Sequence, residues 1–193
     1  MSEGPLPPPC EDCITPESHK RLIAYTVGPP GADLSFKQRL AHENGWDLAR
    51  AEMAFQEYKR FAYLCVHSDT PCTPSVEVDQ VWHLHMTYTH DYWGRFCPGV
   101  LGYELHHGPT EGGASEDEKH LEQYVHTLAY YEKVYGRPPP SDIWPSPKVR
   151  FSSFPHLRWV NLTEHSLTPK RWIALGMTIT AVVSFMLGWQ ASG

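Results

Sequence analysis

The 193-residue sequence has no run of five or more basic residues, and its formal net charge is −6. Phosphate backbones are bound by clustered Lys and Arg side chains, so this lack argues against nucleic acid as a partner.

The sequence also lacks the H-E-x-x-H motif of metalloproteases and the G-x-S-x-G motif of serine hydrolases. No familiar motif therefore indicates an enzyme class.

The sequence lacks a disulfide framework, because its five cysteines are odd in number and have no typical spacing. Reduced thiols, and hence a cytosolic environment, are the simpler interpretation. Cys10 and Cys13 form a lone C-x-x-C, a weak signal for zinc or redox chemistry that an exposed pair of thiols explains equally well. Residues 1–16 lack the basic start and apolar run of a secretory signal and predict a disordered, proline-rich lead.

Apolar periodicity and end signals predict an all-α fold, a small antiparallel helical bundle over residues 17–147. Ser35 and Gln38 fit a capping box for a helix over 36–44, which Gly45 ends. Asp47 can cap a helix over 48–67. Ser115 and Glu118 suggest a second capping box, for a helix over 116–135.

The stretch from 76 to 97 predicts one helix that concentrates histidine, tryptophan and cysteine, with Thr73-Pro74 as its start signal. At about 100° per residue, one stripe of this helix is suited to the core and includes one histidine. It consists of Val78, Trp82, His85, Thr89, Tyr92 and Phe96. A second stripe carries a carboxylate, two imidazoles and a thiol, and consists of Asp79, His83, Met86, His90, Trp93 and Cys97.

The second stripe contains the candidate site. Asp79 and His83 are four residues apart, so their side chains can meet on the helix surface. His90 lies about 10 Å further along the axis, too far to share one ion with His83. The glycine-rich loop after 97 carries His106 and His107, which can fold back towards the pair. The candidate ligands of a metal site, with zinc as the candidate ion, are therefore Asp79, His83, Cys97, His106 and His107. The favoured combination is His83 and His107 with either Asp79 or Cys97.

Two other interpretations of these residues remain open. The Asp79–His83 pair beside Trp82 can form a buried hydrogen-bonded network that fixes helix packing. Alternatively, Cys97 can act as a nucleophile with His90 or His106 as its base.

The C-terminal part reads as a strap and a membrane anchor. Residues 148–170 are expected to form a Pro-rich strap or linker, and Trp172 to Trp189 contain no charge. Eighteen helical residues span about 27 Å, close to the thickness of a bilayer core, so we expect a transmembrane helix over 171–190. Lys170 and Arg171 precede it, which predicts a tail-anchored, single-pass membrane protein with residues 1–170 in the cytoplasm. A small-xxx-small series at Thr180, Ser184 and Gly188 could pair such helices in a homo-oligomer.

The stretches VDQVWHLHMTYTHDYWGRFC, LGYELHHGPTEGG and PPPSDIWP resemble the bacterial branch of the glycine-rich-domain-containing protein family. The matching positions are Glu77, Val78, Asp79, Trp82, His83, His85, Tyr92, Cys97, Gly102, His106 and His107. The resemblance covers about residues 35–147 and implies a helical domain, but no agreed biochemical activity. Family members often carry a glycine-rich tail after a membrane span or a core domain, and we expect this chain to depart from the family there, because only four residues follow Trp189.

Together these features predict a tail-anchored protein that presents a cytoplasmic helical domain for interaction or scaffolding, with a protein partner or a second copy of the chain. The alternative is a zinc-binding module or a metal-dependent enzyme built on the Trp-His-x-His helix and the His-His loop.

Overall fold

The computed structural model describes residues 16–108 and 112–152, which belong to one compact unit. Within these residues every regular element is a helix and no strand occurs, so the all-α prediction is confirmed. The elements are α1 (Pro16–Ala24), α2 (Phe36–Asn44), α3 (Leu48–His67), α4 (Val76–Thr87), α5 (Thr89–Asp91), the π-helix η1 (Tyr92–Leu101), α6 (Ala114–Tyr135) and α7 (Pro147–Arg150).

Local end signals account for α2 and α3, whose bounds agree with the predicted ones. Ser35 forms the capping box with Gln38, and Gly45 ends α2 in the left-handed conformation at φ 64°. The Asp47 carboxylate caps α3 by accepting from the Arg50 N–H at 2.7 Å. The capping box predicted at Ser115 does not form, because α6 starts two residues earlier with Gly113 at its N-cap position and no side-chain cap.

The predicted helix over 76–97 is interrupted at Tyr88, whose ψ of 59° is not helical. The Ser75 hydroxyl, rather than Thr73, caps α4 by accepting from the Val78 N–H at 3.2 Å. Beyond the break, α5 leads into η1, whose wider i→i+5 turns include Pro98 and continue to Leu101. The first stripe nevertheless faces the core as predicted, apart from the exposed Thr89 next to the break.

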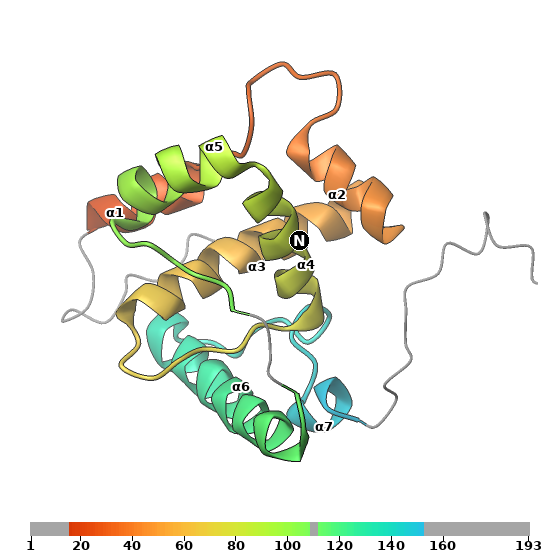
Figure 1. Ribbon diagram of the computed structural model, residues 1–193, viewed down its shortest axis with the longest axis vertical. Helices are drawn as coiled ribbons and strands as arrows, with labels where there is room; N and C mark the ends of the chain where they lie inside the picture. The colour runs from red at the N-terminus through yellow and green to blue at the C-terminus, as the bar shows by residue number, and fades with distance from the viewer. Residues whose placement is uncertain (1–15, 109–111, 153–193) are drawn as a thin grey trace, which may run out of the picture. The chain divides into compact units, whose positions relative to one another are not determined.

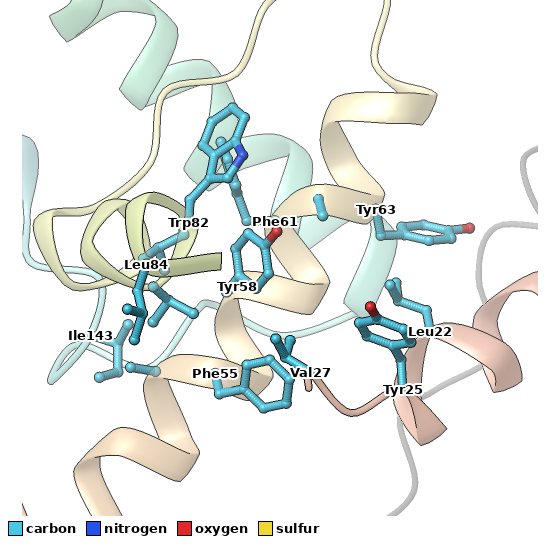
Figure 2. Close-up of a cluster of buried hydrophobic side chains, with 14 of the residues drawn as sticks. Leu22, Tyr25, Val27, Phe55, Tyr58, Phe61, Tyr63, Trp82, Leu84 and Ile143 are labelled. Atoms are coloured by element: carbon cyan, nitrogen blue, oxygen red, sulfur yellow. The ribbon is translucent and has the colours of Figure 1, made fainter. Parts of the chain in front are cut away.

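Helix α3 is the centre of the domain (Figure 1). It packs against α1, α2, α4, η1 and α6, with α1, α2 and α5 above it and α6 and α7 below it in Figure 1. Figure 2 shows the aromatic core on this helix, where Phe55, Tyr58 and Phe61 lie among side chains from α1, α4 and the segment after α6. That last segment contributes the buried Ile143 and Trp144.

No helix among residues 16–108 and 112–152 is long and apolar enough to cross a membrane. The predicted lead, most of the strap (153–170) and the transmembrane helix over 171–190 lie outside the described residues.

Candidate metal centre

Two of the candidate ligands lie one turn apart on the exposed side of α4. The Asp79 side chain is 26% exposed and the His83 side chain 50% exposed, and His83 Nε2 is 3.7 Å from Asp79 Oδ1. Their spacing of four residues produces this contact, as the sequence predicts. Neither side chain is buried, so the pair does not form the buried hydrogen-bonded network that was the alternative interpretation of these two residues.

The third residue, His107, comes from the loop that follows η1. Gly102 ends η1 in the left-handed conformation at φ 67°, which turns the chain back towards α4. The Trp82 indole then donates to the Tyr92 hydroxyl at 2.8 Å, and that hydroxyl donates to the Leu105 carbonyl. This relay holds the loop against α4, and the His107 ring packs edge-on to Trp82 with the ring centroids 4.4 Å apart.

Three ligand atoms converge at the position where the loop meets α4. His107 Nε2 lies 2.8 Å from Asp79 Oδ1 and 3.1 Å from His83 Nε2. One N–H at His107 Nε2 cannot donate a well-aligned hydrogen bond to both Asp79 Oδ1 and His83 Nε2. If all three atoms instead point a lone pair at the same position, that position suits a cation. Among the described residues, Asp79, His83 and His107 form the group of His, Cys, Asp or Glu side chains close enough to hold a metal ion.

The spacing of these three atoms agrees with tetrahedral coordination. Ligand atoms at about 2.0–2.1 Å from a tetrahedral zinc ion are about 3.3–3.4 Å apart. The observed separations of 2.8, 3.1 and 3.7 Å lie around this value. Three protein ligands leave one position of the tetrahedron open, and the exposed His83 side chain places that position at the surface.

The structure places the other two predicted ligands outside this group. Cys97 is fully buried, and burial raises the pKa of its thiol, which opposes both metal binding and nucleophilic attack. The His106 side chain is 71% exposed, lies 3.6 Å from Glu104 and packs against the Trp93 ring. Of the adjacent histidines in the loop, only His107 faces α4.

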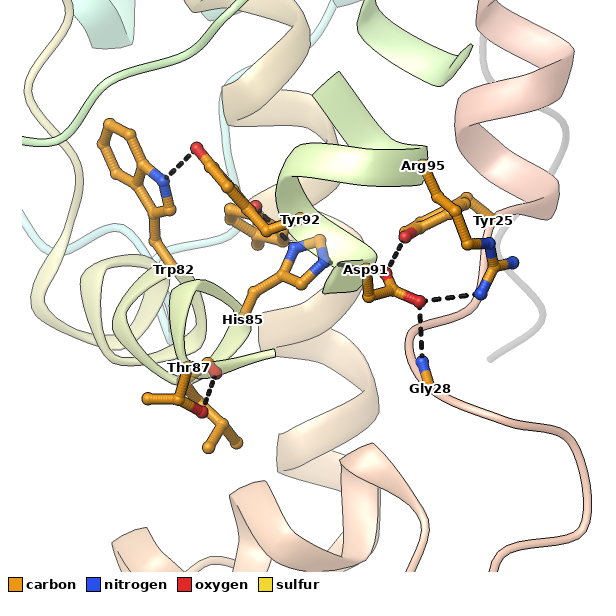
Figure 3. A network of polar contacts seen from close by, with 10 residues as sticks. Tyr25, Gly28, Trp82, His85, Thr87, Asp91, Tyr92 and Arg95 are labelled. Atoms are coloured by element: carbon orange, nitrogen blue, oxygen red, sulfur yellow. Dashed lines mark hydrogen bonds and ion pairs between the residues drawn. The ribbon is translucent and has the colours of Figure 1, made fainter. Parts of the chain in front are cut away.

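The second histidine of Trp-His-x-His belongs to a separate, buried network (Figure 3). His85 Nδ1 lies 2.9 Å from the Tyr58 hydroxyl, and His85 Nε2 lies 3.2 Å from Asp91 Oδ1. The same carboxylate accepts from the Tyr25 hydroxyl, from the Gly28 N–H at 3.2 Å and from Arg95 at 2.7 Å.

These partners define the protonation of His85. The ionised Asp91 carboxylate can only accept hydrogen bonds, so His85 must carry its proton on Nε2 and donate it to Asp91. His85 Nδ1 is then free to accept a hydrogen bond from the Tyr58 hydroxyl. Burial lowers the pKa of His85 to about 4 in spite of the Asp91 carboxylate, so the ring is neutral at pH 7. Burial alone would raise the pKa of Asp91, but its hydrogen bonds from Tyr25 and His85 lower it. This network ties the segment that follows α1, together with α3 and α4, to α5 and η1, and has a structural role.

The sequence predicts that His85 is buried but gives no sign of its partners. Asp91 lies six residues further on, a spacing that no regular helix brings into contact, and it reaches His85 only because the chain breaks at Tyr88. The role of Tyr92 in holding the His107 loop also depends on a contact that local spacing does not indicate.

Comparisons with known proteins add no further assignment, since no family model, curated protein or solved structure matches the chain.

Proposed function

We propose that the helical domain binds one transition-metal ion, with zinc as the candidate, through Asp79, His83 and His107. The observation that carries this proposal is the convergence of two imidazole nitrogens and one carboxylate oxygen within 3.7 Å of one another. The two histidines come from different elements, and the Trp82–Tyr92–Leu105 relay supports their meeting.

The donor set favours zinc over the alkaline-earth ions. Two nitrogens and one oxygen suit borderline ions such as Zn²⁺, whereas Ca²⁺ and Mg²⁺ take oxygen ligands. The Asp79 carboxylate offsets one of the two positive charges, so the bound ion keeps a net positive charge. The open fourth position then takes water or an anionic group from solution, which is the coordination of an exchangeable rather than a closed structural site.

Metal analysis of the purified full-length chain tests the proposal. We expect one zinc ion per chain, and we expect His83→Ala, His107→Ala and Asp79→Ala each to weaken zinc affinity by about tenfold or more. His106→Ala is the matched control, because it removes the adjacent, exposed histidine. Circular dichroism of each variant separates lost binding from lost folding. A chain without zinc affinity, or an equal loss in His106→Ala, would contradict the proposal.

We further propose, from the sequence, that this domain is held at a membrane. The supporting observation is the uncharged stretch from Trp172 to Trp189 behind Lys170 and Arg171, which favours a transmembrane helix with residues 1–170 in the cytoplasm. In this arrangement the domain presents its surface to a cytoplasmic partner or to a second copy of the chain. Deletion of residues 171–193 should move the protein from the membrane fraction to the supernatant. Recovery of the full-length chain in the supernatant would contradict the anchor.

A further inference from the structure

A pocket of about 310 Å³ lies at the loop that joins α1 to α2 (Figure 1). Aromatic rings from α2, from α3 and from the break after α4 line it. Phe36 packs against both Phe55 and Tyr88, with centroid distances of 5.4 Å. The loop contributes Pro29 and Pro30. A mostly apolar pocket of this size is typical of a ligand site, and it shares no residue with the metal centre.

The pocket also carries a few polar groups. The Tyr88 hydroxyl accepts a hydrogen bond from Arg39 Nε at 3.0 Å, and a hydroxyl in this role can still donate its own proton to a ligand carbonyl. Lys37 lines the pocket with a side chain that is 41% exposed and pairs with Glu52. Leu34, also in the lining, is 46% exposed, so apolar surface remains open at this place. The lining therefore favours an apolar ligand with free carbonyl oxygens.

A segment of this chain has that chemistry and lies outside the described residues. Residues 5–9 read Pro-Leu-Pro-Pro-Pro, a sequence that favours the polyproline II helix. With three residues per turn, Pro5 and Pro8 lie on the same face of that helix. The helix makes no internal hydrogen bonds, so its carbonyl oxygens stay free to accept. Proline-rich segments of this kind bind grooves that are lined by aromatic side chains, at a low cost in conformational entropy.

The covalent connection brings the proline-rich segment within reach of the pocket. The loop that lines the pocket follows directly after α1, whose nine residues span about 14 Å. An extended chain over residues 10–15 spans about 20 Å, which exceeds the length of α1. Residues 1–15 contain three acidic residues and no Lys or Arg, whereas Lys20 and Arg21 are exposed on α1. Reach and charge therefore favour the chain's own lead as the occupant of the pocket.

We propose that residues 5–9 bind in this pocket of the same chain as a polyproline II helix, with their proline rings against the three aromatic side chains. The Tyr88 hydroxyl donates to one of the segment's carbonyl oxygens, and the acidic residues that flank the segment lie near the basic residues of α1. The lead thereby covers the apolar surface that is open at Leu34. No ligand of the metal centre takes part, so the proposal stands independently of zinc binding.

Chemical crosslinking of the full-length chain tests the proposal. Cys10 follows the proline segment directly, and Lys37 lines the pocket. A short reagent that joins a thiol to an amine should link these two side chains in a Cys13→Ser chain, where Cys10 is the one thiol of the lead. Replacement of the prolines at 7–9 by alanine should lower the yield of this link about fivefold or more, because the unbound lead loses its pre-ordered conformation as well as its contacts. No link in the Cys13→Ser chain, or an equal yield in the triple-alanine variant, would overturn the proposal.

Two leucine variants separate docking in the pocket from mere proximity. Leu34→Asp puts a charge into the apolar lining and should lower the yield as the alanine replacement does, whereas Leu48→Asp is the matched control. Leu48 is 56% exposed and lies outside the lining, so its replacement should leave the yield unchanged. Circular dichroism checks that each variant is folded. An equal loss in Leu48→Asp would contradict the pocket as the site.

Two further measurements test for other occupants. In a mixture of heavy-isotope-labelled and unlabelled chains, each linked pair of peptides should come from one chain. A link between a labelled and an unlabelled peptide would assign the pocket to the lead of a second copy and contradict the proposal. The dye anilinonaphthalene sulfonate, which binds exposed apolar surface, should fluoresce more with the triple-alanine variant than with its parent chain. Equal fluorescence would show that the lead does not cover the pocket.

Discussion

The Trp82 indole donates to the Tyr92 hydroxyl at 2.8 Å across the break between α4 and η1. This contact lies between two groups of polar side chains, and each group contains one histidine of the Trp-His-x-His motif. His83 points outward to Asp79 and His107, whereas His85 points inward to Tyr58 and Asp91. The Trp-His-x-His helix thus supplies a surface site and a buried network from residues only two apart.

Tyr92→Phe should weaken metal binding without removing a ligand. The substitution removes both the acceptor for Trp82 and the donor to the Leu105 carbonyl, so the His107 loop loses its attachment to α4. We expect zinc affinity to fall about tenfold and stability to fall by about 1–3 kcal/mol. Isothermal titration and urea unfolding measure the two effects. Tyr103→Phe, in the same loop but exposed, is the control. Unchanged affinity in a folded Tyr92→Phe protein would show that the relay does not position His107.

The buried His85 should make the fold sensitive to acid. The pKa of His85 is lowered from its ordinary value of 6.5 to about 4, so the unfolded chain binds a proton that the folded chain does not. Stability is therefore fully present above pH 6.5 and is lost as the pH falls towards 4, by about 2–3 kcal/mol between pH 7.5 and 4.5. Urea unfolding at both pH values should show a smaller loss for His85→Gln, which cannot titrate. An equal loss in the two proteins would assign the acid sensitivity to other groups.

Two glutamates on α3 should differ in their contribution to stability. Glu57 is fully buried and accepts from Arg60, from the Trp144 indole at 2.9 Å and from Tyr131 at 3.3 Å. Glu57→Ala takes away the acceptor on which these buried donors converge and should cost about 3–5 kcal/mol.

Glu52→Ala is the matched control for Glu57→Ala. It breaks the pair with Lys37, in which both side chains are 41% exposed, and the partly exposed hydrogen bond from Gln56, and should cost at most about 1 kcal/mol. Similar free energies of unfolding for the two variants would contradict this distinction.

Zinc should stabilise the folded protein by an amount that rises with the logarithm of the free zinc concentration above Kd. At a free zinc concentration of one hundred times Kd, the expected gain is about 2.7 kcal/mol, or a rise in Tm on the order of 10 °C for a domain of this size. Calorimetry with and without zinc measures the rise, which should vanish in His107→Ala. An equal rise in that variant would place the stabilising ion elsewhere on the chain.

Much of the fold is readable from local signals. Ser35, Gly45 and Asp47 determine the ends of α2 and α3, and the helical period correctly places His85 inside. The same period correctly brings Asp79 and His83 together, since only one turn of helix separates them.

The errors begin after Tyr88, where the break and the wider turns of η1 end the regular helical period on which the prediction depends. Cys97, which an unbroken helix places on the same stripe as Asp79 and His83, faces the core instead. The choice between His106 and His107 depends on the path of the loop, which the contact from Tyr92 to Leu105, thirteen residues apart, determines. Such a contact leaves no periodic signal in the sequence.

Crystals of the protein soaked in zinc and measured at the zinc absorption edge test the central claim most directly. The account predicts one anomalous peak at about 2.0–2.2 Å from Nε2 of His83, Nε2 of His107 and a carboxylate oxygen of Asp79. A fully occupied peak elsewhere, for example at His106 and Glu104, with none among these three residues would contradict it.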